Sequence, residues 1–102
     1  MAQIHALCKD DAVVLTQHLL LRCHEREIKV DDIMAVILRG EIIEQYPTDY
    51  PYPSCLMVYG LDKDKYLHVV AGIGENRLWI ITAYHPDKRK WDDRYRTRKA
   101  DE

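Results

Sequence analysis

The sequence lacks the features that mark several well-known classes of protein. It has no apolar run near the roughly 18 residues that a membrane-spanning helix needs. Its start, Met-Ala-Gln-Ile-His, does not show the basic and then apolar pattern of a secretion signal. We therefore expect a cytoplasmic protein without membrane contact.

Cysteine is scarce and scattered, at Cys8, Cys23 and Cys55, with no Cys-x-x-Cys pair. This odd, widely spaced set predicts buried thiols and not a disulfide framework. His5 precedes Cys8 by three residues, but nothing nearby completes a four-ligand zinc site. We expect neither a metal nor another cofactor.

The common signatures of large enzyme classes are also missing. No nucleophile motif, phosphate-binding loop, dinucleotide fingerprint or zinc-protease motif occurs. With 102 residues, 47% of them hydrophobic and 31% charged, the chain has the composition of one globular domain with one core. We expect a single domain over residues 1–102.

Charge is distributed unevenly along the chain, whose net charge is −2. Residues 1–84 contain 8 Lys and Arg against 12 Asp and Glu, whereas residues 85–102 contain 7 against 5. Lys and Arg bind nucleic-acid phosphates without regard to sequence. The basic C-terminal tail therefore either contacts RNA, with Lys88, Arg89 and Arg94 as candidate binding residues, or is solvated.

A first helix is predicted from Asp10 or Asp11 to about Arg26. Its apolar stripe recurs at spacings of three and four residues: Cys8, Ala12, Leu15, Leu19 and Cys23. Beside this stripe, His18, Arg22 and Arg26 recur every four residues. We expect this polar row to point into a groove between the helix and the sheet.

A second helix is predicted to start at Asp31 or Asp32 and to end before Gly40. Alternating strand patterns follow: Glu41–Tyr46, Ser54–Leu61, Tyr66–Ile73 and Arg77–Tyr84. The expected fold class is α+β, with two N-terminal helices followed by a four-stranded antiparallel sheet. After Pro86 the chain is expected to form a short C-terminal helix or an irregular segment.

The alternation also predicts how side chains divide between the two faces of the sheet. His68 lies on the face opposite Leu67 and Val69. Thr82 and Tyr84 are predicted to share a face with the apolar residues of their strand, Leu78 and Ile80. We expect both faces to be covered, one by the helices and the other by the tail, a dimer mate or another protein.

The polar residues gathered in this way include the groups that metal-independent RNA cleavage needs. That reaction requires a base for the 2′-hydroxyl proton, an acid for the departing 5′-oxygen and cations near the phosphate. His68 or His18 suits the proton transfers, Tyr84 can donate, and an arginine offers a forked contact to phosphate. Each has a structural alternative, such as a satisfied half-buried histidine or a packed tyrosine ring. From the residues alone, the function stays open.

Several short segments occur in a fixed order along the chain: His18-Leu-Leu-Leu-Arg22-Cys-His-Glu25-Arg26, Gly40-Glu-Ile-Ile-Glu44-Gln-Tyr46-Pro47, Pro51-Tyr-Pro53-Ser54-Cys-Leu56, Leu67-His68-Val69-Val70, and Ile80-Ile-Thr82-Ala-Tyr84-His-Pro86 with Trp91. Together they resemble a family of small bacterial proteins catalogued as a domain of unknown function. Where family members tend to have glycine after the helix motif, this chain has Glu27. The helix is therefore expected to continue or to end without a glycine cap.

Members of that family look like the barnase/EndoU/colicin/RelE superfamily of ribonuclease toxins, and they are often encoded beside a zinc-finger antitoxin. The resemblance implies a RelE-like fold and an endoribonuclease toxin. Its catalytic residues would be His68, Thr82, Tyr84, His18 and Arg22, with Arg26 binding substrate. Its partners would be RNA, including mRNA on the ribosome, and a small antitoxin, with no DNA contact by the chain itself. The alternative is a non-catalytic protein- or RNA-binding module on the same fold.

Overall fold

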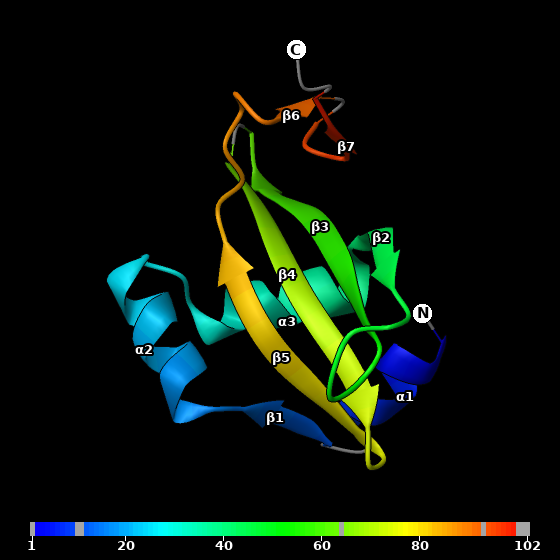
Figure 1. Cartoon of the computed structure of the whole chain (residues 1–102). Helices are drawn as coiled ribbons and strands as arrows, with labels where there is room; N and C mark the ends of the chain where they lie inside the picture. The colour runs from blue at the N-terminus through cyan, green and yellow to red at the C-terminus, as the bar shows by residue number, and fades with distance from the viewer. Residues whose placement is uncertain (1, 10–11, 64, 93, 100–102) are drawn as a thin grey trace.

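A mixed five-stranded sheet, covered by helices on one face, forms the body of the protein in the computed structural model (Figure 1). The structure describes residues 2–9, 12–63, 65–92 and 94–99. Their elements are α1 (Ala2–Lys9), β1 (Val13–Leu15), α2 (Gln17–Glu25), α3 (Val30–Arg39), β2 (Glu41–Tyr46), β3 (Ser54–Asp62), β4 (Lys65–Gly74), β5 (Arg77–Tyr84), β6 (Trp91–Asp92) and β7 (Thr97–Arg98). None of the described helices is long and apolar enough to cross a membrane.

The predicted fold class is wrong. The sheet has the order β1-β5-β4-β3-β2, and its edge strand β1 runs parallel to β5 while the other neighbours are antiparallel. The prediction had two helices and a purely antiparallel four-stranded sheet. In place of a C-terminal helix or an irregular segment, β6 and β7 pair as a separate two-stranded sheet.

The first predicted helix is interrupted because part of it pairs with the sheet. Residues 13–15 lie opposite Leu78, Trp79 and Ile80 of β5. Adjacent valines in this segment favour an extended backbone, and the pairing outweighs the helical spacing of the apolar residues. Helix α2 then starts at Gln17, and the hydroxyl of its N-cap Thr16 accepts a hydrogen bond from the Leu19 N–H at 3.1 Å. The predicted start at Asp10 or Asp11 lies outside the described residues.

Helix α2 ends in a left-handed cap, although the residue there is Glu27 and not glycine. Glu27 has φ 57°, and the Ile28 N–H donates to the Cys23 carbonyl at 2.8 Å. This hydrogen bond, which joins residues five positions apart, is that of a Schellman motif. A side chain in the left-handed region is disfavoured by roughly 1–2 kcal/mol. The end of α2 is therefore formed against the local preference of its residue.

Glu27→Gly is expected to raise the free energy of unfolding by about 0.5–1 kcal/mol, because glycine removes the steric penalty but makes the unfolded chain more flexible. Urea unfolding measures the change. Glu25→Gly, at the last residue of α2, is the matched control and should lower the stability by up to about 1 kcal/mol. A loss of stability in both variants would show that the left-handed backbone is not strained by Glu27.

The N-cap of helix α3 lies two residues before Asp31, the nearer of the two predicted caps. This N-cap is Lys29, whose backbone N–H donates to the Asp32 carboxylate at 3.4 Å. Gly40 follows the helix, as predicted. A Cβ at Gly40 would lie 2.5 Å from the Val36 carbonyl oxygen and 2.6 Å from that of Val58. Glycine is thus needed for α3 to turn directly into β2 beside β3.

A bulge in β5 reverses the facing of its last residues. Val70 of β4 lies opposite Thr82, but the next residue, Ala71, lies opposite Ile80. The extra residue moves Thr82 and Tyr84 to the face opposite Leu78 and Ile80. The prediction that they share a face with those two apolar residues is therefore wrong.

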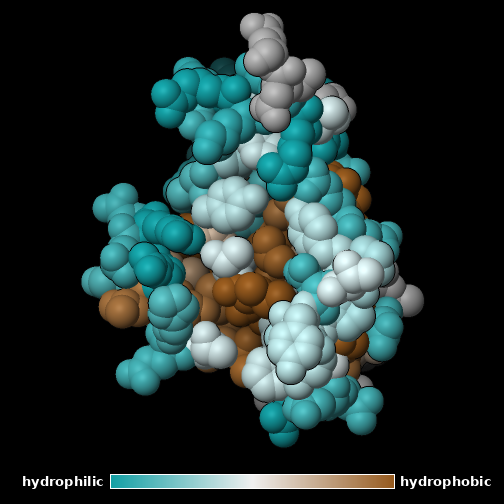
Figure 2. Space-filling model, in the orientation of Figure 1, coloured by the Kyte–Doolittle hydropathy of each residue, from teal (hydrophilic) through white to brown (hydrophobic). Residues whose placement is uncertain are grey.

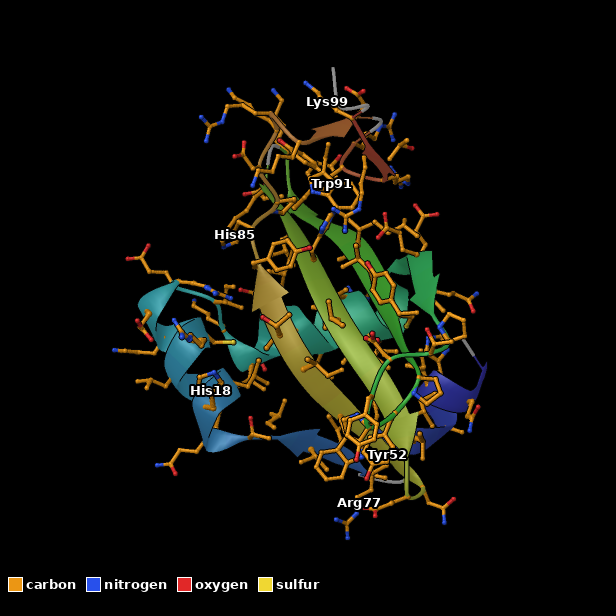
Figure 3. All side chains as sticks on the ribbon, viewed as in Figure 1. His18, Tyr52, Arg77, His85, Trp91 and Lys99 are labelled. Atoms are coloured by element: carbon orange, nitrogen blue, oxygen red, sulfur yellow. The ribbon has the colours of Figure 1, made fainter. Side chains whose placement is uncertain are left out.

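The face turned away from the helices is called the open face below, and the described residues cover it only at its ends. At one end Tyr52 stacks on Trp79, with ring centroids 5.7 Å apart. At the other lies the C-terminal hairpin, which consists of β6, β7 and residues 94–96 between them (Figures 1 and 3). Hydrophobic atoms show in the middle of this face, between more polar groups (Figure 2). The sheet and hairpin thus leave a central strip exposed.

Candidate functional site

His68 lies at the centre of the polar residues on the open face. It pairs across the ladder with Tyr84 and is completely buried. Its Nε2 lies 2.8 Å from the Tyr95 carbonyl oxygen, and its Nδ1 lies 3.4 Å from the Tyr84 hydroxyl. A carbonyl can only accept, so Nε2 carries the hydrogen. Nδ1 therefore presents its lone pair to Tyr84.

The C-terminal hairpin closes over this histidine. Trp91 packs edge-on against His68, with ring centroids 4.6 Å apart, and is itself buried. Burial lowers the pKa of His68 below its usual 6.5, outweighing the Tyr95 contact, which raises it. Burial likewise raises the pKa of the Tyr84 phenol above 10.0. At neutral pH the pair is thus a neutral imidazole beside a protonated phenol.

Thr82 and Arg26 extend the site to the edge of the sheet. Nη1 of Arg26 donates to the Ala83 carbonyl at 2.8 Å and approaches the Thr82 hydroxyl at 3.4 Å. Arg26 is exposed, and Nε and Nη2 take part in neither contact. Thr82 lies two residues from Tyr84, on the same face. A cation, a hydroxyl and a phenol therefore line one strip of the open face.

A second polar group joins the hairpin to β2. The Glu44 carboxylate accepts hydrogen bonds from Arg98 at 2.8 and 3.2 Å and from the Tyr46 hydroxyl. Burial raises the pKa of Glu44, but these hydrogen bonds lower it by more, to below the usual 4.5. The guanidinium of Arg98 also lies over the Trp91 ring, 4.7 Å from its centroid.

No sequence pattern assigned a role to Glu44, Tyr46 or Trp91, although all three occur in the segments that carry the family resemblance. The spacing of Glu44 and Tyr46 could have indicated that they belong to one group, because residues two positions apart on a strand share a face. Nothing local indicated that Trp91 would return to β4. Its position depends on the path of the whole C-terminal segment.

His18 and Arg22 do not join the group around His68. Both are exposed on α2, and no hydrogen bond or ion pair within the described residues links them to it. His18 lies at the start of the helix, away from Trp91 (Figure 3). The separation of eight positions between His18 and Arg26 corresponds to roughly 12 Å along a helix. Of the predicted polar row, the structure brings only Arg26 to the site.

The basic tail folds back on the protein, and several of its cations contact carboxylates. Arg96 pairs with Glu41 of β2. Arg89 pairs with Asp87 at 2.9 Å, and its hydrogen bonds lower the pKa of that carboxyl to about 2. The other predicted phosphate ligands, Lys88 and Arg94, are exposed. The described part of the tail is therefore folded against β2, while Lys88, Arg89 and Arg94 stay exposed to solvent.

Neither metal ligation nor a reactive thiolate is indicated by the geometry. Within the parts of the chain that the structure describes, no three His, Cys, Asp or Glu side chains are grouped as ligands of one ion. Burial raises the pKa of the Cys8, Cys23 and Cys55 thiols, which keeps them protonated at neutral pH. The described chemistry is that of His, Tyr, Thr and Arg.

Comparison with known proteins gives one match. A family model described as a domain of unknown function (DUF4258) covers residues 15–85. No curated protein and no solved structure matches the chain. The matched part holds Arg26, His68, Thr82 and Tyr84 and ends before the C-terminal hairpin. The predicted family of unknown function is confirmed, and the likeness to ribonuclease toxins stays a prediction.

Proposed function

The chain belongs to this family of unknown function, and we propose that it is an endoribonuclease, the toxin of a bacterial toxin–antitoxin pair. It cleaves RNA by 2′-hydroxyl attack and without a metal. The observation that supports this is the convergence of His68, Tyr84, Thr82 and Arg26 on one face, from segments far apart in the sequence. These groups supply proton transfer and a cation for phosphate.

The burial of His68 decides how the groups share the chemistry. His68 cannot contact RNA while Trp91 covers it, whereas Tyr84 and Thr82 are half-buried and Arg26 is exposed. His68 therefore acts through Tyr84. The phenol oxygen takes the proton of the RNA 2′-hydroxyl while the phenol proton passes to His68 Nδ1.

The remaining steps take place at the phosphate. The 2′-oxygen attacks the adjacent phosphorus, the bond from phosphorus to the 5′-oxygen breaks, and that oxygen takes a proton from water. The products are a 2′,3′-cyclic phosphate and a 5′-hydroxyl, and His68 returns its proton through Tyr84 to solvent. The Arg26 guanidinium stabilises the negative charge on the phosphate oxygens, and the Thr82 hydroxyl holds that guanidinium in place.

The test compares an oligoribonucleotide with its 2′-deoxy counterpart, both incubated with the purified chain in excess chelator. We expect cleavage of the ribonucleotide alone, with cyclic phosphate ends. His68→Ala should slow it strongly, whereas His24→Ala, at an exposed position of α2, should not. Intact RNA at stoichiometric protein, or undiminished cleavage by His68→Ala, would rule the proposal out.

A non-catalytic RNA- or protein-binding module is the second candidate. The observation that favours it is the complete burial of His68 under Trp91, which suits a structural histidine as well as a proton acceptor. The two candidates differ in cells. A toxin should arrest growth when expressed alone and be neutralised by a small partner protein encoded beside it. A binding module should permit growth and yield a stoichiometric complex with uncut RNA or protein.

A further inference from the structure

We infer that the C-terminal hairpin and the end of α3 together form a binding pocket for a backbone phosphate of the RNA. The pocket has a volume of about 280 Å³. Arg39 lines it from the end of α3, and Arg94 and Arg96 line it from the hairpin. The ring of Tyr66, from β4, forms part of its wall. The three arginines come from two segments more than fifty residues apart in the sequence.

The charge of this pocket is unbalanced. Glu41 is the one carboxylate among its described lining residues, and it pairs with Arg96. Arg39 and Arg94 therefore leave an excess of two positive charges in a small concave site. A protein with a net charge of −2 has concentrated cations here. Guanidinium groups converging on one pocket match the several oxygens of a phosphate.

The backbone of the hairpin is ordered where it carries Arg94 and Arg96. Arg94 and Tyr95 both have left-handed backbone, with φ 54° and 68°. The Arg96 N–H donates to the Asp92 carbonyl at 3.0 Å, and the Tyr95 ring packs on Tyr66 at 5.0 Å. These contacts order the turn without using the guanidinium of Arg94. An ordered backbone at Arg94 and Arg96 lowers the entropic cost of bringing their side chains to an anion.

A neighbouring pocket favours a phosphate of an extended strand over an isolated anion. Tyr66 also lines a second hollow of about 250 Å³, together with Tyr95, Lys65 and His85. Proteins that bind single-stranded nucleic acid without sequence preference combine a positively charged groove with aromatic side chains. This step rests on the proposed function, since RNA is the ligand in both.

The experiment measures binding of a short 2′-O-methyl oligoribonucleotide to the full chain by fluorescence anisotropy at several salt concentrations. This probe cannot undergo 2′-hydroxyl attack, so binding is measured without cleavage. Arg39→Gln and Arg94→Gln should each weaken binding about tenfold. Each should also reduce the slope of log Kd against log salt by about 0.7. Both side chains are exposed, and thermal unfolding should show that the variants fold as the parent does.

Arg77→Gln is the matched control, because it removes the same charge at the opposite end of the molecule (Figure 3). It should leave the slope unchanged. Equal slopes for parent, Arg39→Gln and Arg94→Gln would overturn the phosphate pocket. So would inorganic phosphate that binds in the pocket without weakening the binding of the oligonucleotide. The two proposals fail separately. If the parent leaves natural RNA uncut but the variants have a reduced salt slope, only the cleavage proposal fails. If the parent cuts natural RNA but the variants have the slope of the parent, only the pocket fails.

Discussion

Tyr84→Phe is expected to reduce the rate of RNA cleavage by about 10²–10⁴-fold, the usual contribution of a positioned proton-transfer group. The substitution removes only the hydroxyl, which lies 3.4 Å from His68 Nδ1. The ring can keep its edge contact with the imidazole, whose centroid is 5.4 Å away. The proton path from the 2′-hydroxyl to His68 is then broken while the packing remains.

The loss should appear in kcat with little change in KM, because the hydroxyl acts mainly in the transition state. Initial rates of cleavage of a labelled oligoribonucleotide, taken over a range of substrate concentrations, measure both. Tyr50→Phe is the control, since the Tyr50 side chain is 96% exposed in the loop between β2 and β3. If Tyr84→Phe cleaved RNA nearly as fast as the parent, Tyr84 would not be the group that meets the 2′-hydroxyl.

The free energy of unfolding is expected to fall on acidification, because His68 is held neutral in the folded protein. Its pKa is lowered by burial from the usual 6.5 of an exposed histidine. Below pH 6.5 the unfolded chain therefore binds more protons than the folded one. The contribution of His68 is fully present above that pH and is lost as the pH falls toward the lowered pKa. The limiting slope for one group is about 1.4 kcal/mol per pH unit.

Urea unfolding between pH 8 and pH 5, a range set roughly by the ordinary histidine pKa, measures this dependence. Of the charged neighbours, Arg98 lowers the pKa of His68 and Glu44 raises it. His68→Gln, which cannot be protonated, should flatten the curve even though it is less stable at neutral pH. His24→Gln, on the exposed side of α2, should keep the slope of the parent. Identical slopes for His68→Gln and the parent would mean that His68 is not held neutral.

The cover over His68 is held mainly by Trp91 and less by the ion pairs around it. The pairs that join the hairpin to β2, Arg96 with Glu41 and Arg98 with Glu44, involve largely solvent-accessible side chains. Such pairs typically contribute 1 kcal/mol or less, so roughly 2 kcal/mol together. Burying a tryptophan ring removes about 150–250 Å² from water, worth roughly 4–6 kcal/mol at 25 cal/mol per Å². The hairpin is thus a hydrophobic closure with a polar rim.

The position of the hairpin also bears on the family comparison. The family match spans residues 15–85 and so includes β4 and β5 but not Trp91 or Arg98. In this chain those two residues determine the solvent access of His68 and the pairing of Glu44. His68 and Tyr84 thus lie in the matched region, and the residues that cover His68 lie beyond it.

Several elements followed from the sequence because their causes are local. Gly40 marks the end of α3 since a helix needs a small residue where the chain turns against its neighbour. The alternation around Leu67 and Val69 placed His68 on the other face, because side-chain direction in a strand depends only on residue spacing. The short connections between β3, β4 and β5 predicted their antiparallel pairing, because parallel neighbours would need a long crossover connection.

The remaining features depend on contacts between distant segments, which no local pattern contains. Val13–Leu15 is a strand because β5 is beside it, and a bulge against β4 turned Thr82 and Tyr84 to the open face. Trp91 and the Tyr95 carbonyl lie more than twenty residues from His68 in the chain, yet they decide its burial, tautomer and charge. The sequence by itself determined which side chains are available for chemistry. Only the tertiary structure decided which of them meet, because their meeting requires pairing and packing across the whole sheet.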